Sequence, residues 1–134
     1  MSDERPVFGT LGFFQAMADA LMADPVWADK GANITASMIY EYLPPVGKLF
    51  FMNYDGGKIT DVAELASVDE RPSDYVITGA PEVWKAVMRK ELKPATAMAT
   101  GKLKVKGKQV YLLKNMGAFS YILDVMTNLD PVYD

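Results

Sequence analysis

Residues 74–107 read "DYVITGAPEVWKAVMRKELKPATAMATGKLKVKG", and the spacing of the apolar residues changes within this stretch. The segment 74–79 is rich in β-branched and aromatic residues, as strands usually are. The segment 80–92 instead repeats its apolar residues every three or four positions, which predicts an amphipathic helix. The apolar face of this helix consists of Val83, Trp84, Val87, Met88 and Leu92.

The second half of the stretch returns to an extended pattern. A short helix is expected over 93–100, because Pro94 suits a first helical turn. In 101–107 lysines alternate with Leu103 and Val105, which predicts a strand with one hydrated and one apolar face. The whole stretch is therefore expected to fold as strand, helix, short helix and strand.

Three further strands are expected before this unit, over 33–43, 48–54 and 58–65. The last two are separated by Asp55-Gly56-Gly57, and glycines supply the positive φ that a tight hairpin needs. These three strands are predicted to form an antiparallel meander, to which the strand 74–79 is added.

Helices are expected at both ends of the chain. A helix is predicted over 8–24 and stops before Pro25, because a residue that precedes proline avoids the helical conformation; Trp27 follows in a loop or short turn. Two more helices are predicted over 108–116 and 118–129. The fold class is therefore α+β, with a five-stranded, mainly antiparallel sheet that helices cover on one face and water covers on the other.

The composition excludes several kinds of chemistry. The chain has 134 residues, half of them hydrophobic, so we expect one domain over 1–134 with an N-terminal helix and loop over 1–32. It contains no histidine and no cysteine, which removes imidazole proton transfer, thiol nucleophiles, disulfides and the usual zinc ligands. No catalytic residue, metal or cofactor is predicted, and an enzyme here would have to use carboxylates, Lys or Tyr.

The location of the protein is expected to be cytoplasmic. The start, "MSDERPVFGT", is polar and acidic, unlike a signal peptide, and no apolar run is long enough to span a membrane. The tail carries no peroxisomal address. The absence of cysteine fits a reducing compartment.

Positive charge is concentrated in one part of the chain. Residues 85–114 carry nine lysines and arginines against Glu91 alone, a net charge of +8, whereas the remaining five bases and sixteen acids give −11. A local basic region on an acidic protein indicates an anionic partner at one place. Nucleic acid is not expected as that partner, because Leu and Val, rather than stacking aromatics, stand between the lysines.

The stretch 74–107 resembles the lipid-binding domain of the sterol carrier protein 2 (SCP2) family. The matching features are Asp74 at the start of a strand, Trp84 in a helix, the Leu92-x-Pro94 step, the small-residue stretch with Ala97 and Met98, and the closing "GKLKVKG". The strands around "DGGKI" (55–59) also fit, so the resemblance covers about 33–128. It implies an apolar tunnel between sheet and helices that binds sterols, fatty acids, fatty acyl-CoAs or phospholipids without chemical change.

Apolar residues on the helix and strand faces are the candidates for lining that tunnel. They are Phe14, Met17, Leu21, Met38, Tyr40, Trp84, Met88, Met98, Leu103, Val105, Met116, Phe119, Ile122, Leu123 and Met126. The alternative for each is an ordinary place in the core, where methionines fill gaps and helical stripes pack. A tyrosine hydroxyl inside an apolar cavity would orient a polar ligand atom.

The lysines of the last strand have two interpretations. Lys102, Lys104, Lys106 and Lys108 form either the hydrated face of a strand or a contact with anionic headgroups and acyl-CoA phosphates. A transient anionic membrane surface is therefore a possible partner, and both a monomer and a homodimer are compatible with the sequence.

Two other functions stay open at this point. One is a small enzyme that acts on a hydrophobic substrate through a buried carboxylate, although Glu41, Asp61 and Glu64 are expected on the hydrated sheet face. The other is a protein-interaction module that binds an amphipathic partner helix in the same groove.

Overall fold

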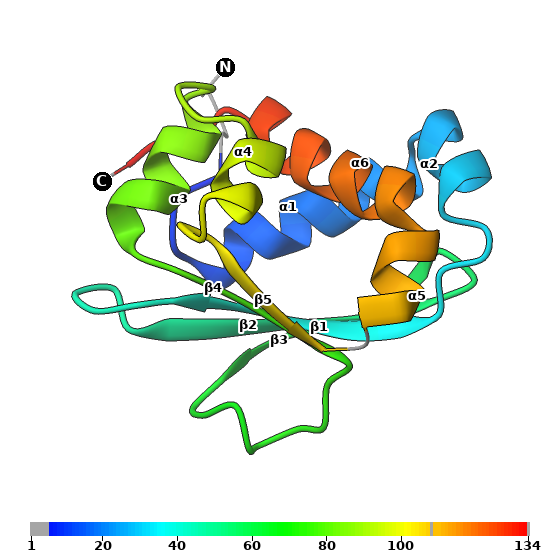
Figure 1. The fold of residues 1–134 in the computed structure, drawn as a ribbon, viewed down its shortest axis with the longest axis horizontal. Helices are drawn as coiled ribbons and strands as arrows, with labels where there is room; N and C mark the ends of the chain where they lie inside the picture. The colour runs from blue at the N-terminus through cyan, green and yellow to red at the C-terminus, as the bar shows by residue number, and fades with distance from the viewer. Residues whose placement is uncertain (1–5, 108, 134) are drawn as a thin grey trace.

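A computed structural model describes residues 6–107 and 109–133 of the chain (Figure 1). The strands are β1 (Ala36–Tyr42), β2 (Lys48–Asp55), β3 (Lys58–Leu65), β4 (Tyr75–Gly79) and β5 (Lys104–Gly107). The helices are α1 (Leu11–Met22), α2 (Pro25–Lys30), α3 (Pro81–Met88), α4 (Pro94–Ala99), α5 (Gln109–Lys114) and α6 (Met116–Asn128).

Strand β1 lies at the centre of the sheet, whose strand order is β3-β2-β1-β4-β5. It pairs antiparallel with β2 and parallel with β4, while the β2–β3 and β4–β5 pairs are antiparallel. The expected α+β class, the five-stranded sheet and the meander of the first three strands are confirmed. The single parallel pair makes the sheet mixed.

A polar contact fixes the start of the parallel pair. The backbone N–H of Asp74 donates to the carbonyl of Ser37 at 3.0 Å, and the Asp74 carboxylate accepts the N–H of Ser37 at 2.9 Å. The register that follows places Met38 beside Tyr75 and Tyr40 beside Ile77. Because alternate residues of a strand share a face, these four side chains lie together on one face of the sheet.

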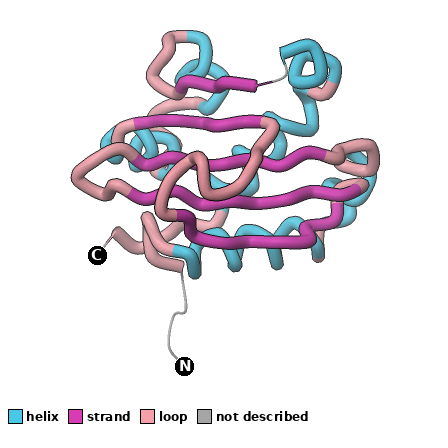
Figure 2. The backbone as a smooth tube through the Cα atoms, turned by 90° about the horizontal axis from the view of Figure 1, so that it is seen from below, coloured by secondary structure: helices cyan, strands magenta, loops and turns pink. Residues whose placement is uncertain are grey.

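The connection from β3 to β4 crosses the sheet on the face opposite the helices (Figure 2). Beneath it Ile39, Phe51 and Leu65 form a small buried cluster. Arg71 of the connection lies over the Phe51 ring, 5.0 Å from its centroid, and forms an ion pair with Asp61. The expectation that water covers this face is only partly right, because the β3–β4 connection covers part of it. The connection crosses here because the helices occupy the other face.

The helices cover the other face of the sheet and form the main core with it (Figure 1). The Phe14 ring of α1 stacks on the Phe50 ring at 4.5 Å between centroids. The Trp84 indole of α3 stacks on the Tyr42 ring at 4.8 Å. Both helices are therefore attached to the sheet through aromatic contacts.

The N-terminal helical region is divided in two. The helix expected over 8–24 is α1, which ends at Met22, and a second helix, α2, begins at Pro25 with Asp24 as its N-cap. Trp27 lies in α2 rather than in a loop. Its indole N–H donates to the Gly57 carbonyl at 2.8 Å, which docks α2 on the β2–β3 hairpin.

Other elements are shorter than the sequence predicts. Strand β1 begins at Ala36 rather than 33, and α3 ends at Met88 because Lys90 leaves the helical conformation with a φ of 63°. Strand β5 spans only Lys104–Gly107, and Leu103 is buried just before it. The first residue of the helix predicted over 108–116 lies outside the described residues.

Gly57 is expected to be the most sensitive glycine of the hairpin. It has a φ of 82°, and a Cβ atom there would lie 2.6 Å from the Gly31 carbonyl oxygen at the end of α2; Gly47 has a φ of 58° with open space around it. We expect Gly47→Ala to lower the free energy of unfolding by about 1 kcal/mol through its φ alone. We expect Gly57→Ala to lower it by roughly 3 kcal/mol, because the α2 end must also move.

Urea unfolding curves with equal m-values measure both losses. Equal losses for the two variants would contradict the role assigned to the close approach between the hairpin and α2.

Candidate ligand-binding site

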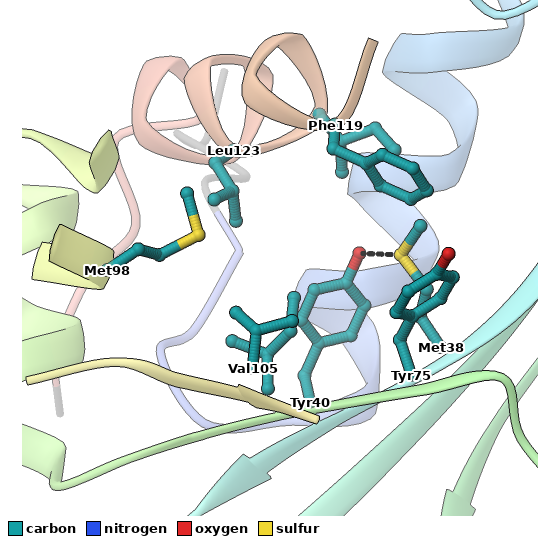
Figure 3. Close-up of a pocket in the computed structure, with 9 residues that line it drawn as sticks. Met38, Tyr40, Tyr75, Met98, Val105, Phe119 and Leu123 are labelled. Carbon is teal, nitrogen blue, oxygen red and sulfur yellow. Dashed lines mark hydrogen bonds between the residues drawn. The ribbon is translucent and has the colours of Figure 1, made fainter. Parts of the chain in front are cut away.

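A small apolar cavity lies between the sheet and α6 (Figure 3). It is lined by Met38, Tyr40, Tyr75, Ile77, Met98, Val105, Phe119, Ile122 and Leu123. All of these side chains are buried except Met98 and Val105, which are partly exposed. The space open to the centre of a water molecule is about 20 Å³, enough for about one water.

The floor of the cavity follows from strand alternation and register. Met38 and Tyr40 stand two residues apart on β1, and Tyr75 and Ile77 do so on the neighbouring β4. Val105 of β5 stands opposite Ile77 in the antiparallel pair. Three adjacent strands therefore present these side chains on the same face.

The roof of the cavity is one face of α6. Phe119, Ile122 and Leu123 are spaced by three and four residues, which places them on one side of a helix. The Phe119 ring lies 5.2 Å from the Tyr75 ring, so the roof meets the floor at that end of the cavity. Figure 3 shows Met98 of α4 and Val105 at the other end.

The Tyr40 hydroxyl is a polar atom among the apolar walls of the cavity. It points up from the sheet and donates to the Met38 sulfur at 3.5 Å (Figure 3). It also lies 3.4 Å from the Tyr54 hydroxyl. Burial raises the pKa of the Tyr40 hydroxyl well above its ordinary value of 10.0, so this group is a neutral donor at physiological pH.

A second buried hydroxyl lies outside the cavity. Tyr42 is sandwiched in the aromatic cluster with Trp84 and Phe50, and its ring is fully buried. Within the described part of the chain, its hydroxyl has no hydrogen-bond partner. Such a group lowers stability rather than raising it.

An open groove of about 470 Å³ adjoins the cavity on the outside. It is lined by Ala95, Met98, Ala99, Leu103, Val105, Met116 and Ser120 of α4, β5, α6 and the turn before β5. Met98 and Val105 also line the cavity. Met98 and Val105 therefore stand between the cavity and the groove, and one of these two side chains is a flexible methionine.

The candidate site residues fall into three groups. The cavity is lined by Met38, Tyr40, Met98, Val105, Phe119, Ile122 and Leu123, and the groove adds Leu103 and Met116. The buried core away from both contains Phe14, Met17, Leu21, Trp84, Met88 and Met126. Sequence reasoning missed Tyr75 and Ile77, although their alternation in "DYVITG" was visible.

The lysines of β5 point away from the cavity. Lys104 and Lys106 are exposed, and so is Lys102, which lies just before the strand. Lys104 stands beside Thr78 and Lys106 beside Val76, on the face opposite the helices. Lys108 lies outside the described residues. Two other bases of the cluster pack on aromatic rings: Lys85 lies 5.7 Å above Phe8 and Arg89 lies 4.7 Å above Tyr133.

Among the described residues, no carboxylate or amine lines the cavity. Glu41 lies on the helix-free sheet face, where its carboxylate accepts the Thr78 hydroxyl at 2.9 Å. Across residues 6–107 and 109–133, no group of three or more acidic side chains is placed to hold a metal ion. Within the same residues, every helix is too short or too polar to cross a bilayer.

A hydrogen bond joins α6 to the start of α2. The Tyr121 hydroxyl of α6 donates to the Asp24 carboxylate, which also accepts the N–H of Val26 at 2.8 Å. The Tyr121 ring stacks on Trp27 at 6.5 Å. The hydrogen bond from Tyr121 lowers the pKa of Asp24 below its ordinary value of 3.8.

This contact predicts a dependence of stability on pH. Because the pKa of Asp24 is lower in the folded than in the unfolded protein, its contribution is complete above about pH 4 and is lost as the pH falls through the folded value. Tyr121→Phe should reduce that acid-side loss, and Asp24→Asn should remove it. Thermal unfolding followed by circular dichroism from pH 7 to pH 2.5 measures the effect.

Asp19→Asn, which removes an exposed carboxylate of α1, controls for the change in net charge. If Tyr121→Phe follows the wild-type curve below pH 4, the hydrogen bond does not hold Asp24 in its ionised form.

Comparison with known proteins identifies a family for most of the chain. The family model described as the SCP-2 sterol transfer family matches residues 19–120. A search of curated protein sequences finds no significant match.

Several solved structures share the fold. A crystal structure of sterol carrier protein 2 aligns with a TM-score of 0.79 at 20% identity, covering 90% of this chain and 97% of that one. The solution structure of a conserved hypothetical protein from Thermus thermophilus, described as possibly a sterol carrier protein, aligns with a TM-score of 0.79 at 20% identity, covering 97% and 94%. The sec-alkylsulfatase Pisa1 from Pseudomonas sp. aligns with a TM-score of 0.58 at 18% identity, covering 83% of this chain but 16% of that enzyme.

Proposed function

This chain belongs to the SCP-2 sterol transfer family, and we propose that it binds a hydrophobic ligand between its sheet and its helices and transfers that ligand without chemical change. The observation that carries the proposal is the pair Met98 and Val105, which lines both a small apolar cavity and an adjoining, more open apolar groove. Movement of these two side chains joins both spaces into one ligand site. Burial of the ligand then contributes roughly 25 cal/mol for each Å² of apolar surface removed from water.

The composition of the cavity supports binding over catalysis. Among the described residues, none of the nine side chains that line the cavity is a carboxylate or an amine. The alternative of a small enzyme that works through a buried carboxylate needs such a group beside its substrate. The small size of the cavity also favours a small ligand over a partner helix, which needs a long open groove.

The proposed route for the ligand leaves the helices in place. The alternative route for release is a displacement of α6 or α1. Rotation of the Met98 side chain is a smaller change than the displacement of a packed helix, because methionine has three rotatable bonds. We therefore place the entrance between α4, β5 and α6.

Native mass spectrometry and a fluorescence titration test ligand binding. The purified protein is expected to carry a copurified lipid or, once delipidated, to bind the uncharged fluorophore N-phenyl-1-naphthylamine with saturation. The absence of both a bound lipid and a saturable signal at high micromolar concentration would exclude the proposed function.

Met98→Ala should speed the association of the fluorophore. Removal of the Met98 side chain opens the wall of the cavity, and a reduction of the barrier by about 1 kcal/mol raises the rate roughly fivefold. Met116→Ala is the matched control, since Met116 lines the groove but not the cavity. Stopped-flow fluorescence measures both rates, and equal rates for the two variants would rule out this entrance.

We further propose that Lys102, Lys104, Lys106 and Lys108 bring the protein to anionic membranes. The exposure of the first three supports this, as does the local excess of positive charge. Lys104→Gln with Lys106→Gln should weaken association with phosphatidylserine vesicles by roughly fivefold per lysine, because each contributes about 1 kcal/mol near such a surface. Binding of N-phenyl-1-naphthylamine should not change.

Lys30→Gln with Lys58→Gln, at exposed positions on α2 and β3, removes the same charge elsewhere. Vesicle sedimentation at low and high salt compares the two pairs. The membrane contact is wrong if both pairs weaken sedimentation equally or if salt has no effect.

A further inference from the structure

The Tyr40 hydroxyl has weak hydrogen bonds for a buried group. Its partners are a thioether sulfur at 3.5 Å and the Tyr54 hydroxyl at 3.4 Å. Strong hydrogen bonds between oxygens are usually about 2.7–2.8 Å long, and sulfur is a weak acceptor. A better acceptor placed in the cavity would therefore displace the Met38 sulfur from this hydroxyl.

The position of Tyr40 makes this hydroxyl available to a ligand. Tyr40 lies on the cavity floor between the Met98 and Val105 end and the Phe119 and Tyr75 end (Figure 3). Its hydroxyl points toward the helix layer, where the ligand would lie. The Tyr54 hydroxyl beside it can donate to Tyr40 while Tyr40 donates to a ligand oxygen.

The cavity offers nothing to balance a charge. None of its nine described lining residues is charged, and burial keeps Tyr40 and Tyr54 protonated. The lysines of β5 lie on the opposite face of the sheet. A carboxylate or phosphate placed among these residues would lose its water and gain little in return, which is strongly unfavourable.

We propose that the ligand is an uncharged lipid whose buried part carries a hydroxyl or carbonyl oxygen, and that the Tyr40 hydroxyl binds this oxygen. The inference rests on the proposed function and narrows it. It disfavours ionised fatty acids and acyl-CoA headgroups as occupants of the cavity, whereas alcohols, ketones and esters fit it. Tyr40 then selects among lipids by one hydrogen bond.

Competition against N-phenyl-1-naphthylamine tests the ligand class in the wild-type protein. The competitors are dodecan-1-ol, 1-chlorododecane and dodecanoate at pH 8, which share a twelve-carbon chain and differ in the end group. Dodecan-1-ol should compete at least about tenfold better than dodecanoate, because only the ionised acid has to bury a charge.

Tyr40→Phe and Tyr42→Phe separate the role of the hydroxyl from that of the ring. Tyr40→Phe should weaken competition by dodecan-1-ol about fivefold, the usual effect of one neutral hydrogen bond, and leave 1-chlorododecane unchanged. Tyr42→Phe is the matched control, because Tyr42 is equally buried on the same strand and does not line the cavity. It should leave all three competitors unchanged.

The results test the ligand class separately from the binding function. If dodecanoate competes as well as dodecan-1-ol, or if Tyr40→Phe changes alcohol and chloride equally, the ligand class is wrong while the binding function stands. If the wild-type protein binds neither the fluorophore nor any competitor, the binding function fails as well. The comparison of the three competitors in the wild-type protein does not depend on how well Tyr40→Phe folds. Thermal unfolding of Tyr40→Phe and Tyr42→Phe checks that both variants are folded.

Discussion

The parallel pairing of β1 with β4 is the constraint on which the rest of the structure depends. It begins at the hydrogen bonds between Asp74 and Ser37 and sets Met38 and Tyr40 beside Tyr75 and Ile77. A parallel pair cannot be closed by a hairpin, so the chain between β3 and β4 crosses the sheet. It crosses the face opposite the helices and leaves the aromatic face to them (Figure 2). The cavity floor exists because this pairing brings three strands together at that face.

Local patterns predicted the elements well but not the partners of each strand. The alternation of "GKLKVKG" and the helical spacing of 80–92 identified a strand and a helix, and Asp55-Gly56-Gly57 identified the β2–β3 hairpin. The neighbour of β1 was not predictable in the same way, because periodicity reports which face of a strand is buried and not which strand lies beside it. The observed boundaries differ from the predicted ones at the end of α3, near Lys90, and at the start of β5, near Gly101. Both residues have positive φ values, which the periodicity of apolar residues does not predict.

Periodicity does not show which elements face one another, and this limit also explains which residues of the candidate site the sequence identified. An apolar stripe shows that Phe14, Trp84 and Phe119 face inward, but it does not show what stands opposite them. In the structure Phe14 stacks on Phe50 and Trp84 stacks on Tyr42 within the packed core, whereas Phe119 closes one end of the cavity. The alternation of Tyr75 and Ile77 shows that both face the core, but it does not show that this part of β4 forms the floor of a cavity.

The small size of the cavity has a consequence for how a carrier behaves between cargoes. With room for about one water, the empty protein keeps its apolar walls in contact with one another. A ligand can enter only if these walls separate. The free energy needed to separate the walls lowers the affinity for every ligand by the same factor. A protein built in this way keeps the walls of its cavity packed when unloaded and returns to that state as soon as the cargo leaves.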